Sequence, residues 1–493
     1  MIRCFALYKE TLGTTFPTPE ERNDALNKTH KRAAEITLKA LEKNGGIYIK
    51  LGQHITALTY LLPPEWTDTM IPLQDQCPRS SLEEIDKMFR ADLGIGMDDL
   101  FEEFELEPVG VASLAQVHIA RLKDSGEKVA VKVQHPSLKE FVPIDVKLTK
   151  MVFDLMYLVF PEYPLTWLGD EMQNSIFVEL DFTKEGENAR KTREYFKDFK
   201  RETALRIPRV VYSQPRILIM EYVAGARLDN LEYMRQHGID TSEVSSCLSH
   251  IFNNMIFTPG VALHCDPHGG NLAIRHIENS TGNGGHNFEI VLYDHGLYRD
   301  IPLQMKRDYS HFWLAVIDND IPKMKEYAYK FAGIEGEQKF RIFMSAITGR
   351  APDNALNYDI RTRRSEREIL DIQFQINSDS KIIEDLMYIL SSMPRMVLLI
   401  LKTNDLTRNL DENLQSHLGP ERTFMIMANY CARCVYEEDQ ELIKEKYQPT
   451  GFSIMKSVEL VKVWWQYQRR ISMLYIYDFV LAIRNARKRI LRL

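Results

Sequence analysis

The pattern of apolar and polar positions begins with a long helical stretch. Residues 20–60 contain few helix breakers apart from the glycine pair at Gly45, and the two prolines of the following LLPPEW segment predict a turn. Ser81 precedes a leucine and two glutamates, which favours a helix start, and this helix is expected to end near Gly94. The chain up to about residue 105 is therefore predicted to be a mainly helical extension.

β-rich runs follow this extension. VASLAQVHIARL and KVAVKVQ are separated by the polar sequence KDSGE, which predicts a β-hairpin. RILIMEYV predicts another strand, ending at Gly225, and LAIRH and FEIVLYDHG predict two short strands around a loop rich in Gly and Asn. From Ile301 onward the pattern is helical.

These elements predict an α+β chain in three parts. They are a helical N-terminal extension over 1–105, a small β-rich lobe over 106–225, and a large, mainly helical lobe over 226–493 that ends in a basic helix. A nucleotide held between two lobes fits this outline. With 44% apolar and 27% charged residues, the 493-residue chain has the composition of a globular protein rather than a disordered one.

The composition adds two expectations. No run reaches the ~18 uninterrupted apolar residues that cross a bilayer, and the first ten residues give no convincing targeting peptide. The six cysteines are scattered and are expected to be reduced thiols. Cys431 and Cys434 form a CxxC without a second pair, which leaves a buried helix face, a zinc site and a redox pair as alternatives.

Charge is concentrated at the C-terminus. Residues 456–493 carry a net charge of +7, against −14 for residues 1–455, and tryptophans and tyrosines lie among the basic residues. This composition suits peripheral contact with an anionic membrane surface. The alternative is a terminal helix that packs its apolar stripe on the protein and exposes its basic face to water.

The segment HCDPHGGN, residues 264–271, carries the candidate chemistry. Asp266 and Asn271 have the spacing of a kinase catalytic loop, in which the aspartate orients a hydroxyl and the asparagine binds magnesium. Asp294 begins an Asp-His-Gly sequence after a predicted strand, and Lys132 lies in the second hairpin strand, as the metal-binding aspartate and phosphate-binding lysine of kinases do. The three kinase landmarks occur in the expected order.

Two alternatives remain open for this segment. A transition-metal site would use the histidine, cysteine and aspartate side chains of 264–268 with His295, but it leaves Lys132 and Asp294 unexplained. The other alternative is a polar loop without chemistry.

The ordered motifs resemble those of the UbiB-like, or aarF-domain, atypical kinases, and within them a mitochondrial branch. The motifs lie within residues 48–296, and PRMVLLILKTNDLTR extends the likeness to Arg408. They are YIKLGQ, VASLAQVH, VAVKVQHP, ELDFTKEGEN, MEYVAG, HCDPHGGN and YDHG. The resemblance implies a two-lobed protein-kinase-like fold.

The resemblance also implies a role for each matching residue. Lys132 would contact the ATP phosphates with Glu185 as its ion-pair partner, and Asp266 would be the catalytic-loop aspartate. The remaining roles divide into nucleotide contacts, magnesium ligands and a family-specific extension. They are nucleotide contacts at Ala112, Ser113, Glu221 and Val223, magnesium ligands at Asn271 and Asp294, and the extension with its partners at Lys50, Gln53, Glu179 and Asp181.

Several features argue against ordinary protein phosphorylation. The phosphate loop reads GVASLAQ, with one glycine where a protein kinase has several, so backbone N–H groups approach the phosphates differently. Cys265 replaces the arginine of the kinase HRD sequence, which meets an activation-loop phosphate. Gly269 replaces the second proline of the family's HxDPHPGN pattern, which loosens the loop.

We therefore expect an ATP-binding, Mg²⁺-dependent ATPase or a small-molecule or lipid kinase, rather than a protein kinase or a nucleic-acid-binding protein. The resemblance implies a role in ubiquinone or lipid homeostasis at the mitochondrial inner membrane, with a lipid or ubiquinone-related molecule as partner. The alternative is a catalytically weak pseudokinase scaffold that binds nucleotide or partner proteins.

Overall fold

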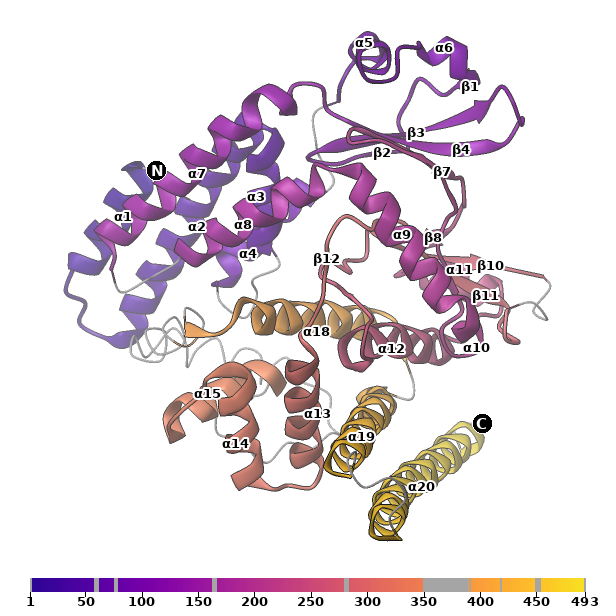
Figure 1. Ribbon diagram of the computed structural model, residues 1–493. Coiled ribbons are helices and arrows are strands. Elements are labelled where there is room, and N and C mark those ends of the chain that lie inside the picture. Colours follow the sequence, from indigo (N-terminus) through magenta and orange to yellow (C-terminus); the bar gives the residue numbers. More distant parts are fainter. Residues whose placement is uncertain are drawn as a thin grey trace.

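The protein has an α+β, two-lobed fold preceded by a helical extension (Figure 1). The computed structural model describes residues 2–56, 62–74, 79–161, 166–278, 283–348, 389, 392–416, 419–447 and 454–491. The extension contains helices α1 (Ile2–Gly13), α2 (Pro19–Asn44), α3 (Gly46–Thr56), α4 (Pro64–Met70), α5 (Leu82–Leu93) and α6 (Met97–Leu100), with a 3-10 turn η1 (Ile71–Gln74).

Local sequence explains how these helices begin and end. The stretch predicted as helical over 20–60 contains two separate helices: α2 ends at Asn44, its C-cap Gly45 has φ +69°, and α3 begins at Gly46. The predicted N-cap at Ser81 is confirmed: its side chain and that of Glu84 form a capping box, and Gly94 ends α5 in a left-handed conformation.

The small lobe is built on a six-stranded sheet. Its main path runs β1-β3-β4-β7-β6, with β2 beside β3, and the predicted hairpin is confirmed as the antiparallel pair β3 and β4. The strands are β1 (Phe101–Phe104), β2 (Gly110–Val111), β3 (Ala115–Leu122), β4 (Lys128–Gln134), β6 (Val210–Ser213) and β7 (Ile217–Glu221). Alternate residues of β4 and β7 pack on Ile85 and Phe89 of α5, so the extension covers one face of this sheet.

Four helical segments connect β4 to the large lobe. They are α7 (Leu138–Val159), α8 (Thr166–Glu179), α9 (Phe182–Phe196) and the short η2 (Lys197–Phe199) with α10 (Lys200–Thr203). Figure 1 shows α7 and α8 beside the extension helices, while α9 runs from the small lobe toward the large one. The extension and both lobes therefore meet near the start of α9.

The large lobe combines short strands with helices. Its four-stranded sheet has the order β5-β11-β10-β8, and β9 pairs with β12. The predicted strands LAIRH and FEIVL are β10 and β11. The strands are β5 (Leu205–Arg206), β8 (Ala226–Arg227), β9 (Leu263–His264), β10 (Leu272–His276), β11 (Phe288–Leu292) and β12 (Tyr298–Arg299).

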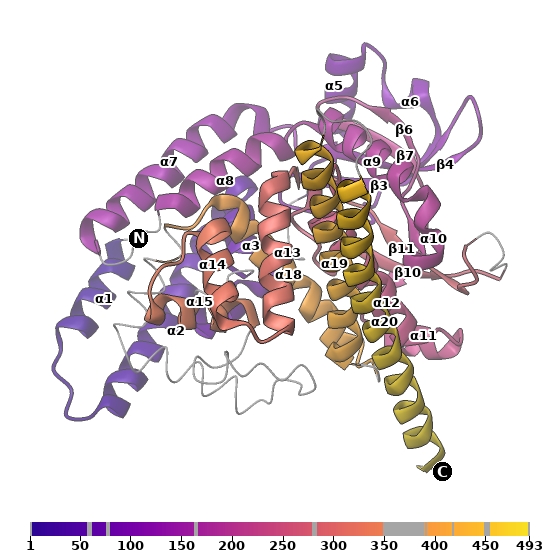
Figure 2. The same cartoon turned by 60° about the horizontal axis from the view of Figure 1, so that its bottom comes forward.

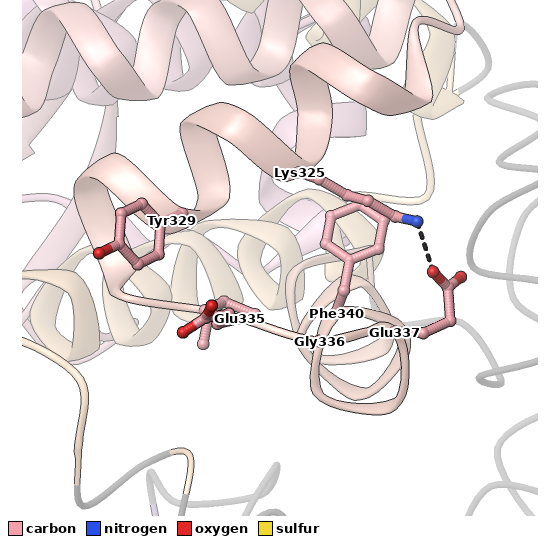
Figure 3. Close-up of a pocket in the computed structure, with 7 residues that line it drawn as sticks. Lys325, Tyr329, Glu335, Gly336, Glu337 and Phe340 are labelled. Carbon is pink, nitrogen blue, oxygen red and sulfur yellow. Dashed lines mark hydrogen bonds and ion pairs between the residues drawn. The ribbon is translucent and has the colours of Figure 1, made fainter.

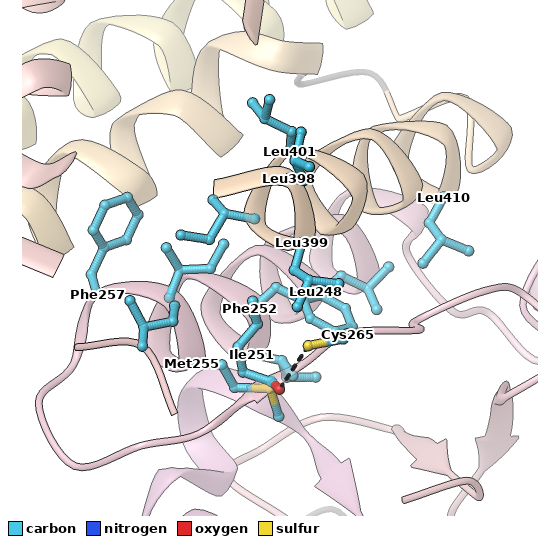
Figure 4. Packing of buried hydrophobic residues seen from close by; sticks show 14 of the residues in the cluster. Leu248, Ile251, Phe252, Met255, Phe257, Cys265, Leu398, Leu399, Leu401 and Leu410 are labelled. Carbon is cyan, nitrogen blue, oxygen red and sulfur yellow. Dashed lines mark hydrogen bonds between the residues drawn. The ribbon is translucent and has the colours of Figure 1, made fainter. Parts of the chain in front are cut away.

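The helices of this lobe form its core. They are α11 (Leu231–Gln236), α12 (Thr241–Phe257), α13 (Leu303–Ile317), α14 (Ile321–Ala332), α15 (Glu337–Thr348), α18 (Arg395–Asn413), α19 (Gly419–Lys446) and α20 (Ile454–Leu491). Figure 4 shows apolar side chains of α12 and α18 around Cys265, which is fully buried between His264 and Asp266. This packing anchors the HCDPHGGN segment on two helices.

The C-terminal helix α20 lies along α19 and extends away from the body of the protein (Figure 2). Tyr467 and Ile471 pack against the core, but many other large apolar side chains of α20 are exposed, including Trp465 and Phe479. In the described part of the chain, no helix combines the length and apolar content needed to cross a membrane.

Candidate nucleotide-binding site

Lys132 joins three elements where the two lobes meet. It lies on β4, and its ammonium group is 2.6 Å from Glu185 Oε1 on α9 and 2.8 Å from Asp294 Oδ2, just after β11. Asp181 positions this end of α9 by capping it, accepting a hydrogen bond of 3.2 Å from the Thr183 N–H. The residues predicted to hold the phosphates and one metal ion are thus brought together.

Burial and charge shift the pKa values of this group. Burial raises the pKa of Glu185 to about 7, although the Lys132 charge opposes the change. Burial would also raise the pKa of Asp294, but Lys132 and the Gly296 N–H outweigh it and hold that pKa well below its usual range. Asp294 is therefore a carboxylate at neutral pH.

A second lysine reaches the site from the helical extension. Lys50, on α3, is 2.9 Å from Glu179 Oε2 and 3.8 Å from Asp266 Oδ2. Burial alone would lower the pKa of Lys50, but the charges of Glu179 and Asp266 raise it, so the ammonium stays charged. The predicted proximity of Lys50 and Glu179 is present in the structure.

A third lysine was not predicted from the sequence. Lys402, on α18, is 3.0 Å from Asp266 Oδ1, so the carboxylate of the predicted catalytic residue lies between two ammonium groups. The available signal was a lysine within the apolar run LLILK of the matching C-terminal motif. A buried lysine needs a charged or polar partner, but the sequence did not identify Asp266 as that partner.

The catalytic-loop segment is held by backbone contacts. His264 donates from Nε2 to the Asp294 carbonyl oxygen at 3.0 Å and accepts from the Asp266 N–H at 3.1 Å through Nδ1. Asn271 donates from its side-chain amide to the Asp266 carbonyl oxygen at 3.1 Å. Burial lowers the pKa of His264, which keeps the ring neutral and able to make both bonds.

These contacts bear on the alternative of a transition-metal site. The His264 ring is hydrogen-bonded to the backbone, and Cys265 is buried in the apolar core. Within the described ranges, no group of three or more His, Cys, Asp or Glu side chains is placed to hold a metal ion. A preassembled transition-metal centre at 264–268 is therefore not supported.

The predicted phosphate loop is partly closed on itself. The Ala112 N–H donates to the Ala115 carbonyl oxygen at 2.7 Å, and the Ala112 carbonyl oxygen accepts from His135 Nε2 at 3.0 Å. Ser113 is buried. The Ala112 amide is thus occupied, in contrast to the amides that contact phosphate in glycine-rich loops.

The predicted hinge connects the two lobes after β7. Glu221 forms an ion pair with Arg206 and accepts from the Arg209 N–H at 3.1 Å. The Val223 carbonyl oxygen accepts a 2.8 Å hydrogen bond from the Tyr293 hydroxyl. Tyr293 directly precedes Asp294, so the hinge and the metal-ligand segment are physically linked.

Gln53 does not join the charged cluster. Its side-chain amide donates to the Leu73 carbonyl oxygen at 3.0 Å, within the extension. Gln53 therefore holds α3 against the turn at 71–74, and it supports Lys50 indirectly through the same helix.

The residues present fit a nucleotide with a divalent cation. Four acidic side chains, Glu179, Glu185, Asp266 and Asp294, lie around three lysine ammonium groups. Glu179 Oε1 is buried and has no hydrogen-bond partner among the described residues. Asn271 and Asp294 supply amide and carboxylate groups, and Mg²⁺ prefers a few such oxygen ligands together with substrate phosphates.

A pocket of about 330 Å³ lies elsewhere, between α14 and α15 (Figure 3). Lys325 and Glu337 form an ion pair across it, and Tyr329 and Phe340 supply apolar lining. None of the residues predicted to bind nucleotide lines this pocket. The candidate nucleotide site therefore rests on the charged cluster around Lys132 and not on this cavity.

Comparisons with known proteins agree with the kinase-like motifs. A family model described as "ABC1 atypical kinase-like domain" matches residues 72–328, slightly more than half of the chain. ABC1 family protein MCP2 of Saccharomyces cerevisiae is 61% identical over 483 residues, which is 97% of this chain and 84% of the relative. AarF domain-containing kinase 1 of Drosophila melanogaster is 36% identical over 462 residues, or 93% of this chain and 85% of the relative.

Further relatives extend the same likeness. An MCP2 homolog of Schizosaccharomyces pombe is 48% identical over 438 residues, covering 89% of this chain and 78% of the relative. Among solved structures, that of Rv3197 with erythromycin from Mycobacterium tuberculosis aligns with 74% of this chain and 95% of its own, at 19% identity and a TM-score of 0.43.

Proposed function

The chain belongs to the ABC1 atypical kinase-like family, and from this premise we propose that it binds ATP with Mg²⁺ and acts as an ATPase or as a kinase of a small molecule or lipid. The contact of Lys132 with both Glu185 and Asp294 carries the proposal. This arrangement is the one that kinases use to hold phosphates and a metal ion.

Each charged residue has a role in this proposal. Lys132 neutralises the phosphates, and Glu185 holds the Lys132 side chain in the cleft. Asp266 positions the hydroxyl of an acceptor or a water molecule. Bound Mg²⁺, held by Asn271 and Asp294, would neutralise charge that develops on the phosphates.

The position of Lys50 favours a substrate other than a protein. Helix α3 brings Lys50 to 2.9 Å from Glu179 and 3.8 Å from Asp266, so the extension lies beside the residue that would position an acceptor. A peptide segment would have to displace this buried ion pair, which costs several kcal/mol. A small acceptor, or water, needs less space beside Asp266.

We further propose that the protein functions in lipid or ubiquinone homeostasis in mitochondria, with α20 in peripheral contact with an anionic membrane. The family resemblance supports the first part. The exposed apolar side chains of α20, among them Trp465, Ile476 and Phe479, support the second, together with the basic residues of 456–493.

A thermal-shift titration tests the nucleotide site. Purified protein is heated with ATP or ADP, with and without Mg²⁺, beside the variant Asp294→Asn. A ligand that binds only the native state at 100 times its Kd adds ~2.7 kcal/mol of stability. We expect a Mg²⁺-dependent increase in Tm that Asp294→Asn abolishes, and no increase with any nucleotide would contradict the proposal.

One observation favours a second candidate function. The occupied Ala112 amide removes a donor that active kinases direct at phosphate, as a pseudokinase scaffold would allow. Cellular complementation with Asp266→Asn separates the two functions. Loss of function supports catalysis, whereas full rescue by this variant supports the scaffold.

A further inference from the structure

Helix α7 has a second apolar face that no described residue covers. Val142, Val146 and Phe153 are buried against the protein. On the opposite side, six large apolar residues are between 41% and 77% exposed. They are Phe141, Ile144, Leu148, Met151, Leu155 and Leu158, which we call the α7 seam.

The spacing of the α7 seam is that of a coiled coil. Its residues follow one another at alternating intervals of three and four, the a and d positions of consecutive heptads. Figures 1 and 2 both show α7 at the outer edge of the molecule. A soluble helix with apolar residues on both sides is expected to be covered on both sides.

The charges beside the seam favour a protein partner over a membrane surface. Lys139, Lys147 and Lys150 are balanced on α7 by Glu140, Asp145 and Asp154. A helix that binds anionic lipid carries an excess of basic residues on its polar face. The α7 seam lacks that excess, whereas balanced flanking charges are typical of helix pairing.

Lys147 and Asp154 are among the charges that remain available for a partner. Asp145 bonds to the Tyr48 hydroxyl at 3.2 Å, and Lys150 is 3.1 Å from Asp170. Lys147 and Asp154 are exposed, and neither forms an ion pair with another described residue. Both lie directly before a residue at a heptad a position, where the helices of a coiled coil form ion pairs with each other.

We propose that the α7 seam pairs with the same seam of a second copy of this chain, with the two helices antiparallel. Read from either end, the seam has the same spacing, so Phe141 faces Leu158 of the second copy and Leu148 faces its Met151. Each residue at a heptad a position then packs against a residue at a d position of the second copy. A two-fold axis makes this contact self-complementary and closed.

Charge selects the antiparallel arrangement. In an antiparallel pair, Lys147 lies beside Asp154 of the second copy, and the two-fold axis forms this ion pair twice. In a parallel pair, Glu140 would lie beside Asp145 of the second copy, which places like charges together twice. Opposite charges across the seam therefore specify both the partner and its direction.

Sedimentation of the full chain from low to high micromolar concentration tests the proposal. We expect a monomer–dimer equilibrium that Met151→Glu abolishes. Lys147→Asp and Asp154→Lys should each weaken the dimer roughly tenfold, because each replaces two attractive pairs with two repulsive ones. The double variant K147D/D154K should restore dimerisation, since the pairs are re-formed with exchanged signs.

Cysteine cross-linking tests the direction, in a Cys77→Ser background, since the other five cysteines are buried. A mixture of Leu148→Cys and Met151→Cys chains should form a mixed disulfide under mild oxidation. Leu148→Cys alone should cross-link poorly, because this residue faces itself only in a parallel pair.

Three results would overturn the proposal. They are a monomer at every concentration, efficient cross-linking of Leu148→Cys alone, and failure of the double charge exchange to restore the dimer. A vesicle-flotation assay adds a fourth: if Met151→Glu releases the protein from anionic vesicles, the α7 seam binds membrane instead of a second copy.

Discussion

Lys402 and Asp266 form an ion pair across the large lobe, with 3.0 Å between Nζ and Oδ1 and 136 residues between them in the chain. The lysine side chain is only 11% exposed. Its helix α18 packs on α12 beneath the catalytic-loop segment (Figure 4). The position of the Asp266 carboxylate therefore depends on a helix outside the seven motifs of residues 48–296.

Removing this lysine should reduce turnover more than nucleotide binding. In Lys402→Met, Asp266 loses its 3.0 Å ion pair with Lys402 and keeps the longer contact with Lys50, so its carboxylate moves from the acceptor position. We expect kcat to fall by about tenfold or more with a small change in KM for ATP, a pattern that reports a loss at the transition state. Phosphate release measured across ATP concentrations gives both parameters.

Two variants complete this test. Lys402→Arg keeps the charge and should retain part of the activity, whereas Lys444→Met, at an exposed position of α19, should leave kcat unchanged. An increase in KM without a fall in kcat would show that Lys402 contributes to nucleotide binding rather than to the placement of Asp266.

Removing the Lys50 charge should change basal nucleotide use. Lys50→Ala frees Asp266 from one of its two cations and leaves Glu179 as a buried carboxylate without its partner. We expect an altered ratio of ATP to ADP affinity and an altered basal ATPase rate. Isothermal titration and a phosphate-release assay measure both, with the exposed Lys39→Ala of α2 as control. Identical profiles for the two variants would exclude an influence of α3 on the cleft.

The sequence predicted which residues form the charged cluster around Lys132, but it did not predict all of their ion-pair partners. Lys132, Glu185 and Asp294 were expected together because the family resemblance assigns them to one phosphate- and metal-binding site, and the structure brings them within hydrogen-bonding distance. Lys402 was missed because its contact with Asp266 depends on how α18 packs. A tertiary contact of this separation leaves no local pattern.

Lys306 shows the same limit in the core. It lies in an otherwise ordinary amphipathic pattern, yet its buried ammonium group donates to the carbonyl oxygens of Met255, Thr258 and Val261 at 3.0, 2.6 and 2.7 Å. These groups lie at and just after the end of α12, where helix carbonyls lack partners. The glycine pair at Gly45 was noted as a helix breaker, but a glycine alone does not decide between a tolerated helix position and a helix end, so the sequence did not fix the boundary between α2 and α3.

Two histidines should make the fold sensitive to acid. Desolvation by burial lowers the pKa of His30 to about 4 and that of His250 to about 4, from 6.5. The unfolded chain then binds more protons between about pH 6.5 and pH 4, so the free energy of unfolding falls as pH falls through this range. Each histidine contributes a slope of up to ~1.4 kcal/mol per pH unit.

Urea unfolding at a series of pH values measures this slope. The double variant with His30→Gln and His250→Gln should lose stability less steeply as the solution is acidified, because glutamine does not titrate. Equal slopes for the variant and the natural chain would assign the acid sensitivity to other groups, such as the ion-paired carboxylates.

Gly52 should be the residue of the extension least tolerant of a side chain. A Cβ at this position of α3 would lie 2.0 Å from Leu73 Cδ1 and 3.2 Å from Leu41 Cδ1, and both leucines are buried. Gly52→Ala must therefore displace the turn at 71–74, at a cost of ~1–3 kcal/mol in the free energy of unfolding.

Because Gly52 is two residues from Lys50 on the same helix, this movement should also reproduce part of the nucleotide profile of Lys50→Ala. Chemical unfolding and the phosphate-release assay measure the two effects, with Gly13→Ala as control because its Cβ meets no atom within 4 Å. Full stability with an unchanged nucleotide profile would show that α3 and the turn at 71–74 adjust independently of the cleft.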